Sequence, residues 1–292
     1  EAPVRGWQSH ATVFGFVTAA ALALAFVTIE QAARHPMLDI TLFADRRFSA
    51  ASASVTVTFF CLAGFIFLIT QYFQVLRGFS PLDTGLRILP VALSIAIGSI
   101  CGGLLAPRIG TRTVVVSGLI SFGTAMAWIA GSIDTDTPYP TIIVPQMLLM
   151  GLGIGLVSTP ATESIMLVLP PSRAGIGSAV NDATRELGST LGVAVVGSLF
   201  SSIFGARLID SASALTGRAS EAADSVQVAF AMTTNNPALV TAANQSFLAG
   251  LAAACTLLAG LCYLAAAVGV AALPGRRFKP PLAETGAALT NR

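Results

Sequence analysis

The feature that most constrains the fold is a series of apolar stretches, each long enough to cross a lipid bilayer as a helix. The hydrocarbon core of a bilayer takes about 20 mostly apolar residues per helix. We predict seven such helices, over residues 11–29, 48–73, 84–106, 113–132, 140–168, 176–204 and 245–273. The segments between them are charged or rich in turn-forming residues. The chain is therefore predicted to be an all-α membrane protein embedded in the lipid bilayer.

Composition supports this class and argues against others. Only 10% of the 292 residues are charged, whereas soluble globular proteins carry about 25%. The formal net charge of +2 gives no indication of a nucleic-acid partner. The sequence contains no nucleophile triad, phosphate loop or metal-ligand spacing, so we predict no enzyme, no metal site and no cofactor. The four cysteines lie in apolar stretches and are interpreted as small apolar side chains: Cys61, Cys101, Cys255 and Cys262.

Basic residues predict how the helices are oriented. Short loops that face the cytoplasm carry an excess of Lys and Arg. Alternation of the spans puts most basic loop residues on one side, which we predict to be cytoplasmic together with the C-terminus. These residues are Arg34, Arg46, Arg47, Arg108, Arg112, Arg173, Arg276, Arg277 and Lys279. The opposite side receives Arg77 and the long connection 205–243.

The stretch NDATRELGSTLG, residues 181–192, brings charge into an otherwise apolar helix. Asp182, Arg185 and Glu186 lie about two turns from its cytoplasmic end, and Glu163 lies near the same end of the preceding helix. Ionisable groups at membrane depth are costly and usually functional. Because a dry site with surplus carboxylate favours protonation, Glu163, Asp182 and Glu186 are proton-coupling candidates. Asp182 and Arg185 can pair at i, i+3, with Arg185 as the counter-charge. A purely structural charge network is the alternative.

Other residues within the spans suggest roles in a substrate path or in helix packing. Polar or adaptable side chains could line a path or could satisfy helix–helix contacts; these are Gln71, Gln146, Met150 and Asn181. Gly151 and Gly155 have the i, i+4 spacing of a close helix crossing. Pro160, in the same span, predicts a kink in its helix.

Several motifs resemble one transporter family. They are GWQSHATVFGFVTAAALALAFVTIEQAARHPMLDITLFADRRF, YFQVLRGFSPLDTGLRILP, GGLLAPRIGTR and PATESIMLVLPPSRAGIGSAVNDATRELGSTLGVAVVGSLFSS, in this order along the chain. Together they resemble the C-terminal half of fourteen-helix drug:proton antiporters of the major facilitator superfamily, the EmrB/QacA type. The resemblance runs from about Gly6 to about Gly275.

The resemblance implies a domain organisation. Residues 1–47 would be a linker transmembrane helix with an amphipathic cytoplasmic linker. Residues 48–273 would be the C-terminal six-helix bundle, with 205–243 as an extracellular loop, and 274–292 a cytoplasmic tail. The partner would be the missing N-terminal transporter half, and the location a plasma membrane, the inner membrane in a bacterium. A gating loop would include Gly103, Arg108, Gly110 and Arg112, although Pro107 replaces the aspartate that usually precedes the arginine.

The function implied is proton-coupled export of multiple drugs or other small molecules by alternating access. The ligands would be protons and amphipathic or cationic small molecules. Two other interpretations remain open at this point. One is a stand-alone seven-helix receptor or membrane scaffold, and the other is an inactive transporter fragment.

Overall fold

The computed structural model describes residues 9–32, 43–167, 174–212, 226, 229–230 and 237–273. Its elements are α2 (His10–Ala32), α3 (Arg46–Gln71), η2 (Tyr72–Leu76), α4 (Pro81–Ile109), α5 (Thr111–Ser132), η3 (Tyr139–Ile143), α6 (Val144–Leu167), α7 (Ala174–Ala212) and α10 (Pro237–Ala272), where η denotes a π-helical turn. Within these residues, seven helices are long and apolar enough to cross a membrane. The predicted all-α membrane class is confirmed.

The helix ends differ most around the predicted extracellular loop 205–243. Helix α7 continues to Ala212, and α10 already starts at Pro237. Proline is well suited to the first turn of a helix because the missing N–H has no partner there anyway. Both ends of the predicted loop are therefore helical. The predicted linker between 33 and 42 and the predicted tail 274–292 lie outside the described residues.

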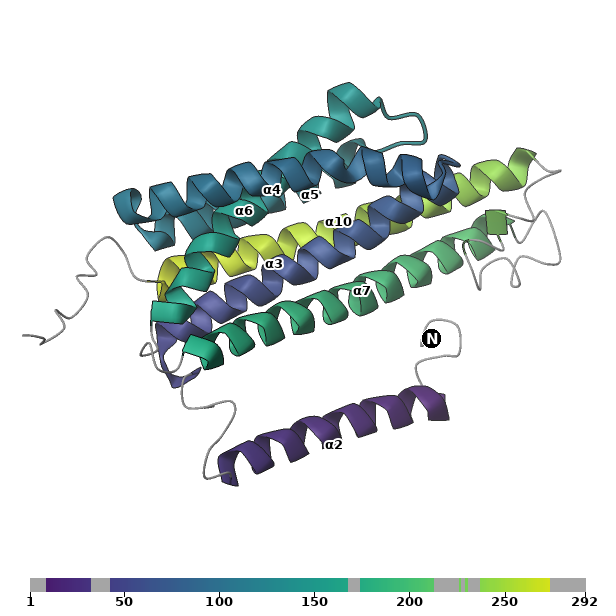
Figure 1. The fold of residues 1–292 in the computed structure, drawn as a ribbon. Coiled ribbons are helices and arrows are strands. Elements are labelled where there is room, and N and C mark those ends of the chain that lie inside the picture. Colours follow the sequence, from purple (N-terminus) through teal and green to yellow (C-terminus); the bar gives the residue numbers. More distant parts are fainter. Residues whose placement is uncertain are drawn as a thin grey trace, which may run out of the picture.

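The helices form a bundle from which α2 stands apart (Figure 1). None of the apolar side chains of α2 is buried, and Glu30 is its one buried residue. The other helices alternate in direction. The starts of α3, α5 and α7 thus share one end of the bundle with the ends of α4, α6 and α10, on the left of Figure 1. We call this the inner end, after the orientation that the sequence predicts, and the opposite end the outer end.

The bundle consists of two equivalent three-helix units, α3–α4–α5 and α6–α7–α10. Exchanging the units maps the main helix contacts onto one another. The contact of α4 with α6 corresponds to that of α7 with α3, and the contact of α5 with α6 corresponds to that of α10 with α3. Each unit has an odd number of spans, so the second unit starts from the opposite side of the membrane. This is the arrangement of an inverted repeat.

Glycines allow the corresponding contacts to be close. A Cβ atom at Gly98 of α4 would lie 2.6 Å from the carbonyl oxygen of Leu152 on α6, and one at Gly192 of α7 would lie 2.9 Å from Cα of Phe60 on α3. In a lipid environment, such close backbone approach replaces hydrophobic burial as the source of helix association. Both units thus use glycine on their second helix to pack against the first helix of the other unit.

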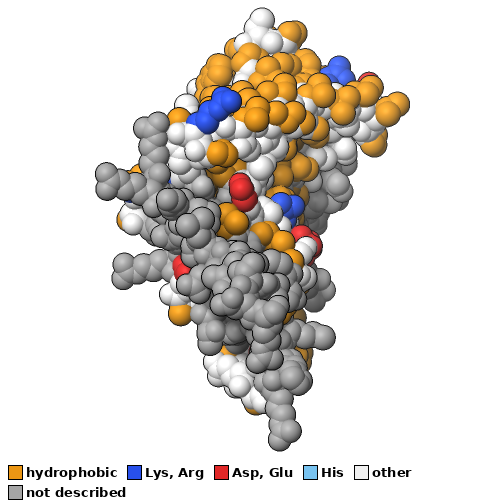
Figure 2. Space-filling view, turned by 60° about the vertical axis from the view of Figure 1, so that its left-hand side comes forward, with side chains coloured by type: hydrophobic (Ala, Val, Ile, Leu, Met, Phe, Trp, Pro, Cys, Tyr) orange, Lys and Arg blue, Asp and Glu red, His pale blue; other side chains and the backbone are white. Residues whose placement is uncertain are grey.

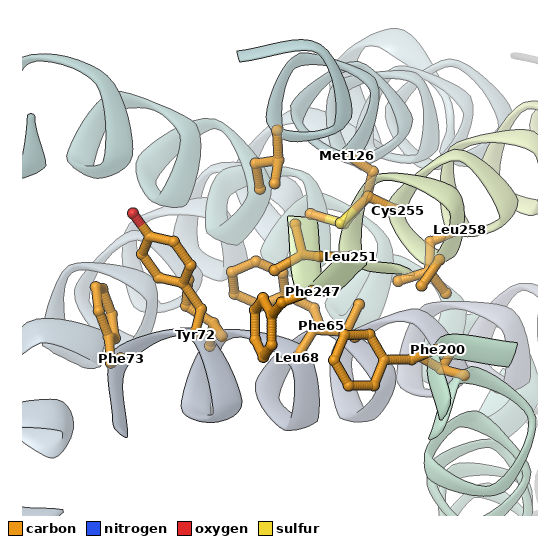
Figure 3. Packing of buried hydrophobic residues seen from close by; sticks show 14 of the residues in the cluster. Phe65, Leu68, Tyr72, Phe73, Met126, Phe200, Phe247, Leu251, Cys255 and Leu258 are labelled. Atoms are coloured by element: carbon orange, nitrogen blue, oxygen red, sulfur yellow. The ribbon is translucent and has the colours of Figure 1, made fainter. Parts of the chain in front are cut away.

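The main core is built by α3, α5, α6, α7 and α10, and its large aromatic side chains lie where α3, α7 and α10 meet (Figure 3). Phe65, Phe200 and Phe247 come from these three helices and are each at most 1% exposed. The rings of Phe200 and Phe247 meet edge to face with their centroids 5.0 Å apart, a favourable geometry for aromatic pairs. This core fixes α3 beside α7, which is where the candidate site lies.

Hydrogen bonds join the two hairpin connections at the outer end. The Tyr72 hydroxyl donates to the carbonyl of Asp134 at 2.8 Å, and Arg77 Nη1 donates to the carbonyl of Thr135 at 2.6 Å. Tyr72 is the first residue of the π-helical turn η2, and the other π-helical turn, η3, directly precedes α6. The connection from α3 to α4 is thereby held against the connection from α5 to α6.

Candidate functional site

The charged part of α7 meets α3 and α6 near the inner end. Arg185 Nη2 donates to the Thr162 hydroxyl on α6 at 3.3 Å, and its guanidinium lies over the Phe59 ring of α3, 4.9 Å from the centroid. The Thr162 hydroxyl in turn donates to Oδ1 of buried Asn181 at 3.2 Å. Arg185 Nε is buried without a hydrogen-bond partner among the described residues. Arg185 thus links three helices.

The predicted Asp182–Arg185 ion pair is not formed. Among the described residues, no carboxylate oxygen lies within 4.0 Å of the Arg185 guanidinium. An ion pair between described residues joins Arg87 to Asp83 at the outer end. The physical reason is that Arg185 extends across to Thr162 and Phe59 on neighbouring helices, away from the carboxylates of its own helix. The counter-charge role of Arg185 stays a prediction.

The three candidate carboxylates are exposed on the surface of the bundle. Glu163 on α6 is exposed, as are Asp182 and Glu186 on α7. Figure 2, in which the inner end is turned forward, shows few acidic and basic side chains, lying among hydrophobic ones. Exposure on a face of an apolar bundle leaves these carboxylates open to a ligand or to another part of a larger protein.

An open groove lies between α3 and α7, on the side of α7 that carries Asp182 and Glu186. It has a volume of about 350 Å³ and is almost entirely apolar; its lining residues are Ala63, Ile66, Phe67, Thr70, Gln71 and Val193. Asp182, Glu186 and Val193 have the spacing i, i+4, i+11, which places them on one face of a helix. Glu186 lies about 10 Å along the helix axis from Val193, at a rise of 1.5 Å per residue. One face of α7 therefore carries carboxylates toward the inner end and apolar groove toward the middle.

Helix α7 packs closely on α3 beside this groove. A Cβ atom at Gly188 would lie 3.2 Å from the Phe60 backbone nitrogen, and one at Gly64 would lie 2.6 Å from the Val196 side chain. Gly188 and Gly192 have the same i, i+4 spacing as Gly151 and Gly155. The sequence interpretation missed this second pair, although its spacing is visible in LGSTLG.

The structure separates the predicted substrate-path residues. Gln71 lines the groove. Gln146 is 1% exposed and donates from Nε2 to Ser132 Oγ at 2.7 Å, while Met150 is 0% exposed within the core. Asn181 is buried against α6 through Thr162. Gln146, Met150 and Asn181 are thus buried and Gln71 borders open space, and a role for any of them in a substrate path stays a prediction.

Residues predicted for helix packing lie at the contact of α6 with α4. A Cβ atom at Gly151 would lie 2.6 Å from the carbonyl oxygen of Val91, and one at Gly155 would lie 2.5 Å from the carbonyl carbon of Gly98. Pro160 is buried within α6, which continues past it to Leu167. Its ring lies 3.3 Å from a Cβ built on Gly102.

The predicted gating loop is shorter than the sequence suggested. Helix α4 runs through Pro107 to Ile109, α5 starts at Thr111, and Gly110 alone joins them with a φ of 93°. This backbone conformation is readily adopted only by glycine. Arg108 lies in the last turn of α4 and Arg112 in the first turn of α5. Gly103 lies about two turns before Gly110, near Thr159 of α6.

Metal chemistry has no candidate in the part of the chain that the structure describes. No group of three or more His, Cys, Asp or Glu side chains there could hold a metal ion. What the arrangement offers is an apolar groove, a polar amide at its edge and carboxylates on the same helical face.

The fold and this site define a polytopic membrane protein. It is built from two equivalent three-helix units, and one face of α7 carries both carboxylates and an apolar groove. A model of the Major Facilitator Superfamily matches residues 3–193. The chain therefore belongs to this superfamily, which is a family of membrane transporters and not a class of enzymes.

Individual relatives narrow the comparison. Multidrug resistance protein Stp of Mycobacterium tuberculosis is 36% identical over 208 residues, 71% of this chain and 38% of Stp. Puromycin resistance protein pur8 of Streptomyces alboniger is 31% identical, over 70% of this chain and 41% of pur8. Multidrug efflux pump LfrA of Mycolicibacterium smegmatis is 29% identical over 269 residues, 90% of this chain and 53% of LfrA. The chain thus spans about half or less of the length of these relatives.

Proposed function

We propose that this chain forms the C-terminal half of a proton-coupled exporter of amphipathic or cationic small molecules that works by alternating access. In this proposal residues 48–273 are the transporter bundle, 1–47 the linker helix and linker, and 274–292 a cytoplasmic tail. The other half of the transporter covers the groove face and completes the binding site. The names of the relatives, which refer to multidrug efflux and to drug resistance, support drugs as the exported molecules.

The observation that carries the proposal is the two-part face of α7. Val193 of this face borders an apolar groove, and Asp182 and Glu186 of the same face carry carboxylates. An amphipathic cation needs both parts, because its apolar body gains from contact with the groove and its charge gains from a carboxylate in a low-dielectric site. The groove without the carboxylates would not distinguish a cation from a neutral molecule.

Coupling follows from competition at the carboxylates. A proton that neutralises Asp182 or Glu186 removes the attraction for a bound cation, so protonation from outside favours release of the substrate. The same change of charge shifts the balance between outward-facing and inward-facing states, since the two states bind the proton with different affinity. Arg185 acts as a positioning residue, because its contacts with Thr162 and Phe59 hold this part of α7 against α6 and α3.

We further propose that the inner end faces the cytoplasm of a bacterium and that the C-terminus lies there. Arg108 and Arg112 flank the turn at this end. At the outer end, Arg77 is bound to the carbonyls of Thr135 and Thr137. An accessibility tag at the C-terminus should react with an impermeant reagent only after the cells are opened; labelling of intact cells would contradict this orientation.

The experiment for the proposed function is efflux of a fluorescent lipophilic cation from cells that express the complete protein. Asp182→Asn, Glu186→Gln and Glu163→Gln each remove one carboxylate with little change in shape. We expect at least one of the first two to abolish energised efflux at wild-type membrane levels. The matched control is Asp136→Asn, which removes an exposed carboxylate at the outer end and should leave efflux unchanged. Wild-type efflux in both Asp182→Asn and Glu186→Gln would refute the assignment to α7, and loss in Glu163→Gln alone would move it to α6.

A further inference from the structure

Two cysteines from different three-helix units are in contact inside the bundle. The Sγ atoms of Cys61 on α3 and Cys262 on α10 lie 3.6 Å apart, and both residues are 0% exposed. Cys61 Sγ also lies 3.8 Å from the carbonyl oxygen of Leu258, one turn before Cys262. The two cysteines are 201 positions apart in the sequence. Their proximity is therefore a property of the fold and has no signal in the sequence.

The contact is suited to formation of a disulfide. The sulfurs of a disulfide are about 2.05 Å apart, so these two must approach by about 1.5 Å, which requires both side chains to rotate. We propose that Cys61 and Cys262 are a redox-active dithiol that membrane-soluble two-electron oxidants of the quinone or azo class convert to a disulfide. The product would join α3 to α10, and so join the two units covalently.

The location within the membrane determines which oxidants can react. Cys61 lies about 22 Å along the axis from the start of α3, and Cys262 about 15 Å from the end of α10, at 1.5 Å per residue. When the bundle spans the bilayer, both thiols thus lie at the depth of the hydrocarbon core. Charged, water-soluble oxidants do not enter this region, whereas neutral oxidants dissolve in it and reach the buried thiols when the bundle opens locally.

The reaction balances with a neutral azo compound such as diamide. One thiol loses its proton and adds to the N=N bond, which forms an S–N bond. The second thiolate attacks that sulfur, the S–S bond forms, and the S–N bond breaks. The azo compound takes up two electrons and both protons and leaves as a hydrazine. A quinone accepts the same two electrons and two protons and leaves as a hydroquinone.

The chain provides a matched control on the same helix. Cys255 of α10 is 1% exposed and lies in the same core, beside Leu251 and Leu258 (Figure 3). Among the described residues it makes no hydrogen bond to another sulfur, and it is a free thiol like Cys101 of α4. Burial is thus common to Cys61, Cys255 and Cys262, and contact with a second sulfur belongs to one pair only.

The test uses the full chain in membranes, with a protease cleavage sequence inserted after Gly217 so that α3 and α10 fall on different fragments. After treatment with diamide, blocking of free thiols and cleavage, we expect the two fragments to migrate together without reductant and to separate with it. The intact protein should lose the mass of two hydrogen atoms and two of its four reactive thiols. Cys255→Ser should still form the link, and Cys61→Ser and Cys262→Ser should not.

Two results would overturn the proposal. The first is separation of the wild-type fragments without reductant, with four thiols still reactive after denaturation. The second is a link that persists in Cys61→Ser or Cys262→Ser. Peptide mapping of the oxidised wild-type protein makes the decision independent of whether the variants fold, because it must find the Cys61 peptide joined to the Cys262 peptide; a different joined pair also refutes the assignment.

Discussion

At the scale of single residues, two glutamines that look alike in the sequence have different environments. Gln71 and Gln146 both lie in apolar spans. Gln71 borders the groove between α3 and α7, whereas Gln146 is buried and bonded to Ser132. A polar side chain inside a membrane helix either satisfies another helix or faces a site for ligands. Which of the two applies depends on the neighbouring helix, which hydropathy does not reveal.

The same substitution at both positions should separate these roles. Gln146→Leu removes the donor to the Ser132 hydroxyl, which keeps its own hydrogen bond to the carbonyl of Trp128, and should reduce the free energy of unfolding by about 1 kcal/mol. Gln71→Leu removes no protein hydrogen bond that the structure describes and should leave stability unchanged while altering the apparent affinity for a cationic substrate. Unfolding midpoints in detergent and concentration-dependent efflux test the pair. Equal destabilisation by both substitutions would contradict the assignment.

Arg185 shows the same limit of sequence reasoning. The spacing of Asp182 and Arg185 predicted that these residues pair along the helix. In the structure, Arg185 instead contacts Thr162 and Phe59, which belong to two other helices. Charge within an apolar span therefore predicts a candidate region, but the contacts of each side chain depend on the packing of three helices.

At the scale of helices, glycine spacing determines which surfaces meet. The contact of α4 with α6 leaves no room for a side chain at Gly155, since a Cβ there would lie 2.5 Å from the Gly98 backbone. Gly260 of α10 has no atom within 4 Å of such a Cβ. Helix existence and approximate ends were predictable from apolar length, because each span must match the bilayer. The pairing of helices was predictable only in part, through the spacing of small residues.

Substitution of these glycines provides a prediction at this scale. Gly155→Ala should force α6 away from α4 and lower the free energy of unfolding by about 1–3 kcal/mol, the usual cost of overpacking. Gly260→Ala adds the same methyl group in open space and should leave the protein at wild-type stability or slightly above it. Thermal unfolding in one detergent compares the two variants. A Gly155→Ala protein as stable as the Gly260→Ala protein would show that the contact is looser than described.

At the scale of the whole molecule, α2 is separate from the bundle. Its apolar side chains are exposed all round, as for a helix surrounded by lipid, and the bundle core is complete without it. Removal of residues 1–32 should therefore leave the thermal midpoint of the remaining chain unchanged. The measurement is thermal unfolding of both chains in the same lipid nanodiscs. A clearly lower midpoint for the shortened chain would mean that α2 packs on the bundle.

Proton-driven transport by the complete protein is measured most directly in liposomes. With the purified protein reconstituted, an imposed pH gradient should drive transport of a lipophilic cation, and collapse of the gradient by a proton–potassium exchanger should stop it. The double variant Asp182→Asn, Glu186→Gln should insert into the liposomes normally and transport nothing under the same gradient. Transport that continues unchanged without the gradient, or in the double variant, would contradict the proposal that the carboxylates of α7 couple proton entry to export.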